Sequence, residues 1–234
     1  MDDLGDEAAG DRLALLDWVE HDLDRVYAAA APEHPVMRAL APTIRECGLP
    51  DGPFRRLIEA NRRDQLVTRY DTFEELLGYC QLSAAPVGEL VLHVFAAAAP
   101  ERIALSDRVC AGLQVLEHLQ DVGEDYTRGR VYLPREDMRR FGCDEPALAA
   151  GSVSPALREL LAFETTRARA LLDAGPALAR MLAPRPRLAV AGFVAGGQAS
   201  LDALERAHFE VLGAQPRASK GAFARRWLQA VAGR

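Results

Sequence analysis

Three acidic residues in the middle of the chain have the spacing of a metal-binding helix face. Glu117, Asp121 and Asp125 are four residues apart, so a continuous helix would carry their carboxylates in one stripe. Like charges at this spacing destabilise an isolated helix by about 0.2–0.5 kcal/mol per pair, and a cation would offset that cost. Magnesium is typically held by a few carboxylates together with substrate phosphates. The stripe suits such a site, although a solvated helical face is the common alternative for an acidic pair.

The residues around the stripe favour the metal site. Apolar side chains lie on either side of it, and the segment 128–134, R-G-R-V-Y-L-P, follows directly. Arginines in a loop beside a carboxylate pair can offer planar, forked donors to phosphate oxygens. His118 is interpreted as a packed or surface residue in preference to a ligand partner.

A second acidic group lies at the start of the chain. Asp2 and Asp6 repeat the spacing of Asp121 and Asp125. Acidic termini are often only solvated. Two such motifs could instead face each other across a helical cavity and hold metal ions around a diphosphate.

Composition indicates that helices position these residues. Hydrophobic residues make up 49% of the 234 residues but aromatic residues only 6%, and Ala and Leu dominate over Val, Ile and Thr. Apolar periodicity, Pro and Gly signals and the Thr72/Glu75 capping pattern predict the helix boundaries. The predicted helices cover residues 11–30, 35–47, 53 onward, 73–82, 86 onward, 102–125, 134–141, 155–174, 177–182, 187–212 and 219–231. No strand is required, and we expect a single domain.

Charge and cysteine usage exclude several classes of protein. The net charge of -6 gives no basic footprint for nucleic acid. The four cysteines form no C-x-x-C pair, so a reducing cytoplasm fits better than a disulfide framework. The apolar runs are shorter than the roughly 20 residues that span a bilayer, so any membrane contact would be peripheral, at the inner face.

Several motifs together resemble the squalene/phytoene synthase family. The segment 2–7, D-D-L-G-D-E, is similar to the first aspartate-rich motif of that family, and the segment 120–134, Q-D-V-G-E-D-Y-T-R-G-R-V-Y-L-P, is similar to the second. The segments 59–64, 69–76 and 79–88 fall between them in the order of the family. The resemblance covers nearly the whole of residues 1–234.

Within the family, the segment 79–88, Y-C-Q-L-S-A-A-P-V-G, is similar to the bacterial hydroxysqualene synthases. Gln120 and Glu117 stand where phytoene and squalene synthases usually have Arg and Asn, so one diphosphate-binding cation is absent. Family members also carry a helical region before the first motif, and we expect that this region is missing here and that the chain as printed lacks activity without it.

The resemblance implies an all-α, isoprenoid synthase-type helical bundle with a central cavity. It implies Mg²⁺ as cofactor, with Asp2, Asp6, Asp121 and Asp125 as metal ligands supported by Glu117. Arg69, Arg130 and Tyr132 are the implied diphosphate contacts, although a salt bridge to a nearby acid is an alternative for Arg69.

The implied reaction converts presqualene diphosphate to hydroxysqualene on the route to squalene and hopanoids. The alternatives are head-to-head coupling of two prenyl diphosphates, such as farnesyl diphosphate, and a catalytically silent binding or assembly protein. A paralogous synthase and a flavin-dependent reductase are the expected functional associates.

Overall fold

Helices form all the regular elements in the described part of the chain, which comprises residues 11–213 and 215–232 of a computed structural model. The prediction of an all-α fold is confirmed. The helices are α2 (Arg12–Tyr27), α3 (Pro35–Cys47), α4 (Asp51–Arg63), α5 (Phe73–Ser83), α6 (Ala85–Val94), α7 (Pro100–Gln120), α8 (Val122–Thr127), α9 (Arg135–Phe141), the short 3-10 helix η1 (Glu145–Ala149), α10 (Pro155–Leu172), α11 (Gly175–Arg180), α12 (Pro184–Arg206) and α13 (Lys220–Ala232).

Local capping chemistry sets many of these boundaries. The Asp11 side chain accepts a hydrogen bond from the Ala14 amide at the start of α2, and the Thr72 hydroxyl accepts one from the Glu75 amide at the start of α5. Helix α3 ends at Gly48, whose φ of 59° lies in the left-handed region that glycine adopts without strain. These ends agree with the sequence predictions.

Several predicted helix boundaries are wrong, among them the three that follow. The helix predicted over residues 102–125 breaks at Asp121, where φ is -103° and ψ is 10°, and continues as the separate helix α8. Helix α4 begins at Asp51, before Pro53, because Pro50 already takes the extended N-cap conformation. The helix predicted to reach residue 212 ends at Arg206, because His208 and Phe209 adopt positive φ values.

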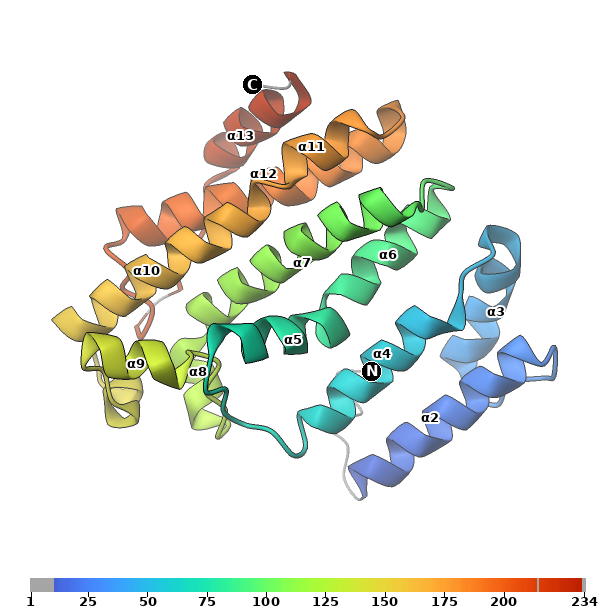
Figure 1. Ribbon diagram of the computed structural model, residues 1–234, viewed down its shortest axis with the longest axis horizontal. Helices are drawn as coiled ribbons and strands as arrows, with labels where there is room; N and C mark the ends of the chain where they lie inside the picture. Colours follow the sequence, from blue (N-terminus) through green and yellow to red (C-terminus); the bar gives the residue numbers. More distant parts are fainter. Residues whose placement is uncertain (1–10, 214, 233–234) are drawn as a thin grey trace.

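Helix α7 is the central element of the larger core. It runs between α5 and α6 on one side and α10 and α12 on the other (Figure 1). Its side chains Val109, Val115 and Leu119 are buried in a cluster that extends to Leu160 and Leu172 on α10. Burial of this apolar surface supplies most of the driving force for placing the acidic end of α7.

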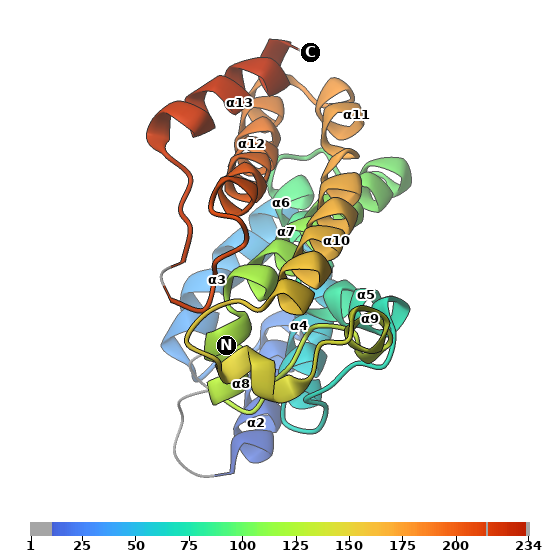
Figure 2. The same ribbon diagram turned by 90° about the vertical axis from the view of Figure 1, so that its left-hand side faces the viewer.

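A second, smaller core holds the N-terminal helices together. Leu16 and Leu23 of α2, Ile44 of α3, and Phe54 and Ile58 of α4 are all buried in it. Both views show these helices as a layer at one side of the molecule (Figures 1 and 2). Among the helices described, none is both long enough and apolar enough to cross a bilayer.

Candidate active site

The acidic stripe lies at the junction between α7 and α8. Glu117 is exposed on the last turn of α7, Asp121 caps the break, and Asp125 lies one turn into α8. The chain stays helical enough across the break for the Asp125 amide to donate to the Asp121 carbonyl over 2.8 Å. Asp125 retains only 15% of its side-chain exposure. The break therefore interrupts the regular helical spacing of the three carboxylates, although the chain still makes a helical turn from Asp121 to Asp125.

The electrostatics of Asp121 show that its charge is not neutralised locally. Burial, followed by the negative charges of Asp125 and Glu117, raises the pKa of the Asp121 carboxyl above its ordinary value. A divalent cation would reverse this effect, and carboxylate oxygens are the donors that Mg²⁺ prefers. Asp121 and Asp125 therefore fit magnesium in donor type and charge.

The remainder of the predicted metal site cannot be placed. Asp2 and Asp6 lie outside the described residues. Within residues 11–213 and 215–232, no group of three His, Cys, Asp or Glu side chains is arranged to hold a metal ion. The pair Asp121 and Asp125 is thus the part of the predicted ligand set that the structure describes, and the four-aspartate arrangement stays a prediction.

Two glutamines hold the acidic side chains. The Gln215 amide, from the segment between α12 and α13, donates to Asp121 Oδ1. Gln114 Nε2, one turn before Glu117, donates to Glu117 Oε2 over 3.1 Å and lies 3.4 Å from His118 Nε2. Gln114 could have been found from its helical spacing, whereas no sequence signal connects Gln215 to a residue 94 positions away.

An aromatic cluster lies beside the carboxylates. The rings of His118 and Tyr132 stack with centroids 3.7 Å apart, and Tyr79 and Tyr70 pack around Tyr132. His118 Nδ1 lies 3.9 Å from Asp125 Oδ2, which is beyond hydrogen-bond distance. His118 is thus a packed residue, as expected, and connects the cluster to the second acidic motif.

The phenol groups of Tyr79 and Tyr132 are buried, and their surroundings disfavour ionisation. The Tyr79 hydroxyl donates to Asp64 Oδ2 over 2.8 Å, a contact that the sequence did not single out. Burial and the neighbouring Tyr132 and Asp64 raise the pKa of Tyr79 far above its ordinary value. Burial and Asp64 likewise raise the pKa of Tyr132, while the positive charge of Arg130 acts in the opposite direction. Arg130 therefore lies within electrostatic reach of this cluster.

Arg69 is engaged in structural contacts. Its guanidinium donates to both carboxylate oxygens of Glu145 over 2.8 and 2.9 Å, and to the carbonyl oxygen of Gly129 over 2.6 Å. Its backbone also pairs with Val131 in an isolated bridge. The salt bridge considered for Arg69 is therefore present. It fixes the R-G-R loop between α8 and α9, and a direct diphosphate contact stays a prediction.

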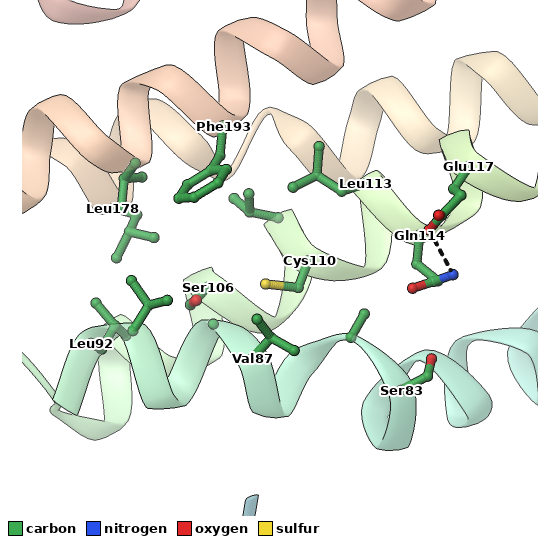
Figure 3. A pocket seen from close by; sticks show the side chains of 15 residues that line it. Ser83, Val87, Leu92, Ser106, Cys110, Leu113, Gln114, Glu117, Leu178 and Phe193 are labelled. Atoms are coloured by element: carbon green, nitrogen blue, oxygen red, sulfur yellow. Dashed lines mark hydrogen bonds between the residues drawn. The ribbon is translucent and has the colours of Figure 1, made fainter. Parts of the chain in front are cut away.

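An apolar cavity of about 250 Å³ begins at Glu117 and follows α7 toward its N-terminus. Figure 3 shows Gln114, Glu117 and Ser83 at one end, and Leu92, Ser106 and Leu178 at the other. Between the ends, side chains of α6, α7 and α12 form the walls, among them Val87, Leu113 and Phe193. The cavity can accommodate a hydrocarbon chain whose polar end lies near the acidic junction.

Gly88 and Cys80 contribute to this region by packing. A Cβ on Gly88 would come within 2.4 Å of Ser106 Oγ, so glycine permits the close approach of α6 to α7. Cys80 is completely buried, and burial raises the pKa of its thiol to about 12. A neutral, buried thiol is typical of a core residue, and we interpret Cys80 as one.

Comparison with known proteins places this arrangement in one family. Residues 1–222 match the family model described as squalene/phytoene synthase. A phytoene synthase from Arthrospira platensis is 36% identical over 178 residues, which cover 70% of this chain and 57% of that protein. A hydroxysqualene synthase from Rhodopseudomonas palustris is 36% identical over 182 residues, covering 76% of this chain and 61% of that protein. The matched regions thus span about three fifths of these two relatives.

A solved structure agrees with the same assignment. The crystal structure of squalene synthase HpnC from Alicyclobacillus acidocaldarius superimposes with a TM-score of 0.84 and 46% sequence identity, covering 89% of this chain and 79% of that one. The family model matches well over half of the chain, and the helical arrangement agrees with it. This chain belongs to the squalene/phytoene synthase family.

Proposed function

We propose that the protein converts presqualene diphosphate to hydroxysqualene with magnesium-assisted release of diphosphate. The observation that carries this proposal is the acidic pair Asp121 and Asp125 beside an apolar cavity that begins at Glu117. A substrate with a diphosphate head and two long hydrocarbon arms needs both features in one place. Neither feature alone would distinguish this site from a solvated acidic face or an ordinary lipid pocket.

The proposed reaction begins with heterolysis of the carbon–oxygen bond to diphosphate, and the electron pair leaves with the oxygen. The resulting cyclopropylcarbinyl cation rearranges, water adds to the cation, and loss of a proton gives the alcohol. Asp121 and Asp125 would hold the metal together with Asp2 and Asp6. Magnesium, when bound, supplies Lewis-acid stabilisation of the departing diphosphate.

The walls of the cavity protect the cationic carbon skeleton. Val87, Leu113 and Phe193 present no nucleophile to the cation, whereas Gln114 and Glu117 make the end near the acidic junction polar. The stacked rings of Tyr132 and His118 hold the R-G-R loop segment next to α7. Arg130, the second arginine of this loop, is the proposed diphosphate contact, because its guanidinium can bind two phosphate oxygens at once.

Head-to-head coupling of two prenyl diphosphates is the second candidate. It is supported by the phytoene synthase from Arthrospira platensis, which is as similar in sequence as the hydroxysqualene synthase. Hydroxysqualene formation is favoured by the segment 79–88, which is similar to the bacterial hydroxysqualene synthases, and by Gln120, which stands where coupling enzymes of the family usually have Arg. Gln120 instead donates to the Pro216 carbonyl over 3.3 Å.

The pathway context belongs to the same proposal. A paralogous synthase would supply presqualene diphosphate, and a flavin-dependent reductase would consume hydroxysqualene. Genes for both beside the gene for this chain would support the assignment. We place the reaction in the cytoplasm.

The test measures pyrophosphate release and product identity with presqualene diphosphate or farnesyl diphosphate as substrate, with and without Mg²⁺. Asp121→Asn should lower pyrophosphate release at least about 100-fold, because the metal would lose a charged ligand. Glu124→Gln is the matched control, since Glu124 is exposed, lies in α8 between Asp121 and Asp125, and pairs with Arg128 over 2.7 Å.

The assay uses the printed chain and a version extended by any in-frame codons upstream of Met1. Magnesium-dependent release that persists in Asp121→Asn would contradict catalysis at this site. Phytoene or presqualene diphosphate formed from single prenyl diphosphates would favour coupling. No turnover by either version would favour a silent binding protein.

A further inference from the structure

The charges of this chain are distributed very unevenly. Residues 175–234 contain nine Lys and Arg but three Asp and Glu, a net charge of +6. The whole chain carries -6, so residues 1–174 carry -12. Such an asymmetry indicates that the C-terminal helices meet an acidic partner, while the rest of the molecule does not.

The outer side of α13 combines positive charge with exposed apolar residues. Lys220, Ala224, Leu228 and Val231 follow one another at helical spacing and are all exposed, Leu228 at 63%. Arg225 lies beside them and is also exposed. We call these five residues the outer face of α13.

Helix α12 extends this surface. Trp227 Nε1 donates to the Leu188 carbonyl over 3.3 Å, which joins the C-terminal half of α13 to the start of α12. Leu188 and Arg185, near that start, are exposed. Both views place α13 at the edge of the molecule against α12 (Figures 1 and 2).

The basic residues of this surface are available for an external partner. Within the described part of the chain, no salt bridge or side-chain hydrogen bond is recorded for Arg185, Lys220 or Arg225. Arg226, by contrast, points to the other side of α13 and holds both oxygens of Asp202 over 2.7 and 2.9 Å. Helix α13 therefore carries Arg226, which binds Asp202, on one side and the exposed cations Lys220 and Arg225 on the other.

We propose that the outer face of α13, with Arg185 and Leu188, docks on an anionic lipid bilayer. A helix with exposed Leu and Val flanked by Lys and Arg lies in the plane of a bilayer surface, with its apolar side chains at the headgroup boundary and its cations at the anionic headgroups. A second copy of the same face is a poorer occupant, because the two sets of cations would repel each other.

The cavity strengthens the choice of a lipid surface. Leu178 of α11 lies at its end remote from Glu117, and Val190 and Phe193 of α12 contribute to its wall. Phe193 is 56% exposed, and the adjacent Gly192 lies against Trp227 of α13. The α12 wall of the cavity therefore lies beside α13, which carries the proposed docking surface. This step rests on the proposed function, because it assumes a hydrocarbon ligand.

Vesicle co-sedimentation of the full chain tests the proposal. Vesicles made of equal parts phosphatidylglycerol and phosphatidylcholine should bind the protein, and phosphatidylcholine vesicles should not. Lys220→Glu/Arg225→Glu should weaken binding about tenfold or more, and added salt should weaken it further. Leu228→Ser should weaken it severalfold. The matched control is Arg38→Glu/Arg45→Glu, which makes the same change in charge at exposed positions of α3.

Far-UV circular dichroism and thermal unfolding establish that each variant is folded. The proposal is overturned if the protein binds neither kind of vesicle, if it binds both equally, or if the α3 control loses as much binding as the α13 variant. Binding requires no turnover, so Asp121→Asn should bind vesicles like the unsubstituted chain. A failure of the proposed reaction would therefore leave this test unaffected.

Discussion

At the scale of single residues, Arg69 shows how a cation suited to phosphate can instead be used to hold a loop. Its guanidinium makes two bonds to Glu145 in η1 and one to the Gly129 carbonyl, so it ties the turn that follows the second acidic motif to η1. This arrangement positions Arg130 and Tyr132 without requiring Arg69 to touch a ligand. The two roles predict different consequences of substitution.

Arg69→Lys should lower the free energy of unfolding by about 1–2 kcal/mol, because a single ammonium group cannot replace the planar fork. The KM for the diphosphate substrate should change by less than about twofold. Denaturant unfolding and steady-state kinetics measure the two effects. Arg135→Lys is the control, since Arg135 makes one exposed contact of 3.2 Å with Asp71 and should cost about 0.5 kcal/mol or less.

The opposite result, an unchanged stability with a raised KM, would support Arg69 as a diphosphate contact. In that case stability would stay within the range of the Arg135 control, while KM would rise about tenfold or more, as expected for the loss of a charged binding contact.

At the scale of elements, adjacent glycines on α12 have opposite environments. A Cβ on Gly197 would lie 2.7 Å from Leu113 of α7 and 2.9 Å from Leu172 of α10. A Cβ on Gly196 would meet only Phe223, at an ordinary 3.9 Å. Gly197 therefore serves close packing of α12 against α7 and α10, whereas Gly196 does not.

Gly197→Ala should lower the free energy of unfolding by about 1–3 kcal/mol, because the added methyl group overpacks the contact between three helices. Gly196→Ala should be neutral or should raise it by up to about 1 kcal/mol, because alanine favours a helix more than glycine does. Thermal and denaturant unfolding of the two single variants compare them directly. Equal effects would show that helix propensity, and not packing, governs this part of α12.

The segments that form helices were largely predictable from periodicity and capping, while the break in the acidic segment was not. The Thr72 cap and the Gly48 end depend on neighbouring residues, so the printed sequence contains the signal. The break at Asp121 depends on tertiary contacts: a Cβ on the following Gly123 would lie 3.1 Å from Leu212, far along the chain. Periodicity alone therefore predicted one helix where there are two.

The site was predictable to a similar extent. Glu117, Asp121 and Asp125 were found from their spacing, because i,i+4 carboxylates on a helix have a recognisable pattern. Gln215 and Asp64 were not, because their contacts with Asp121 and Tyr79 arise only when distant segments pack. The positions of Asp2 and Asp6 relative to this group stay a prediction.

At the scale of the whole molecule, two unequal cores predict unequal stability. The N-terminal core contains ten buried side chains among the described residues, whereas the core around α7 is much larger. Between the two, α4 contributes Phe54 and Ile58 to the smaller core and Ala60 to the larger one. The smaller core therefore has less apolar burial to resist local opening.

Hydrogen exchange should accordingly be faster in α2 and α3 than in α7 and α10. The comparison of α2 with α10 is the most direct, because their lengths are similar at 16 and 18 residues. Exchange followed by mass spectrometry should show protection factors at least about tenfold lower in α2, which corresponds to about 1.4 kcal/mol less opening free energy. Equal protection would indicate that both cores open in a single cooperative step.

The opposite charges of the two parts of the chain give the molecule a large electric dipole. The field of a negatively charged surface exerts a torque on this dipole, which turns the positively charged C-terminal helices toward the surface before any side chain touches it. In Figure 1, α13 lies along the top of the molecule and α8 lies at the lower left. The molecule would therefore arrive with the hydrocarbon end of its cavity toward lipid and its carboxylates toward water, so that an oily product and a pyrophosphate ion depart in opposite directions.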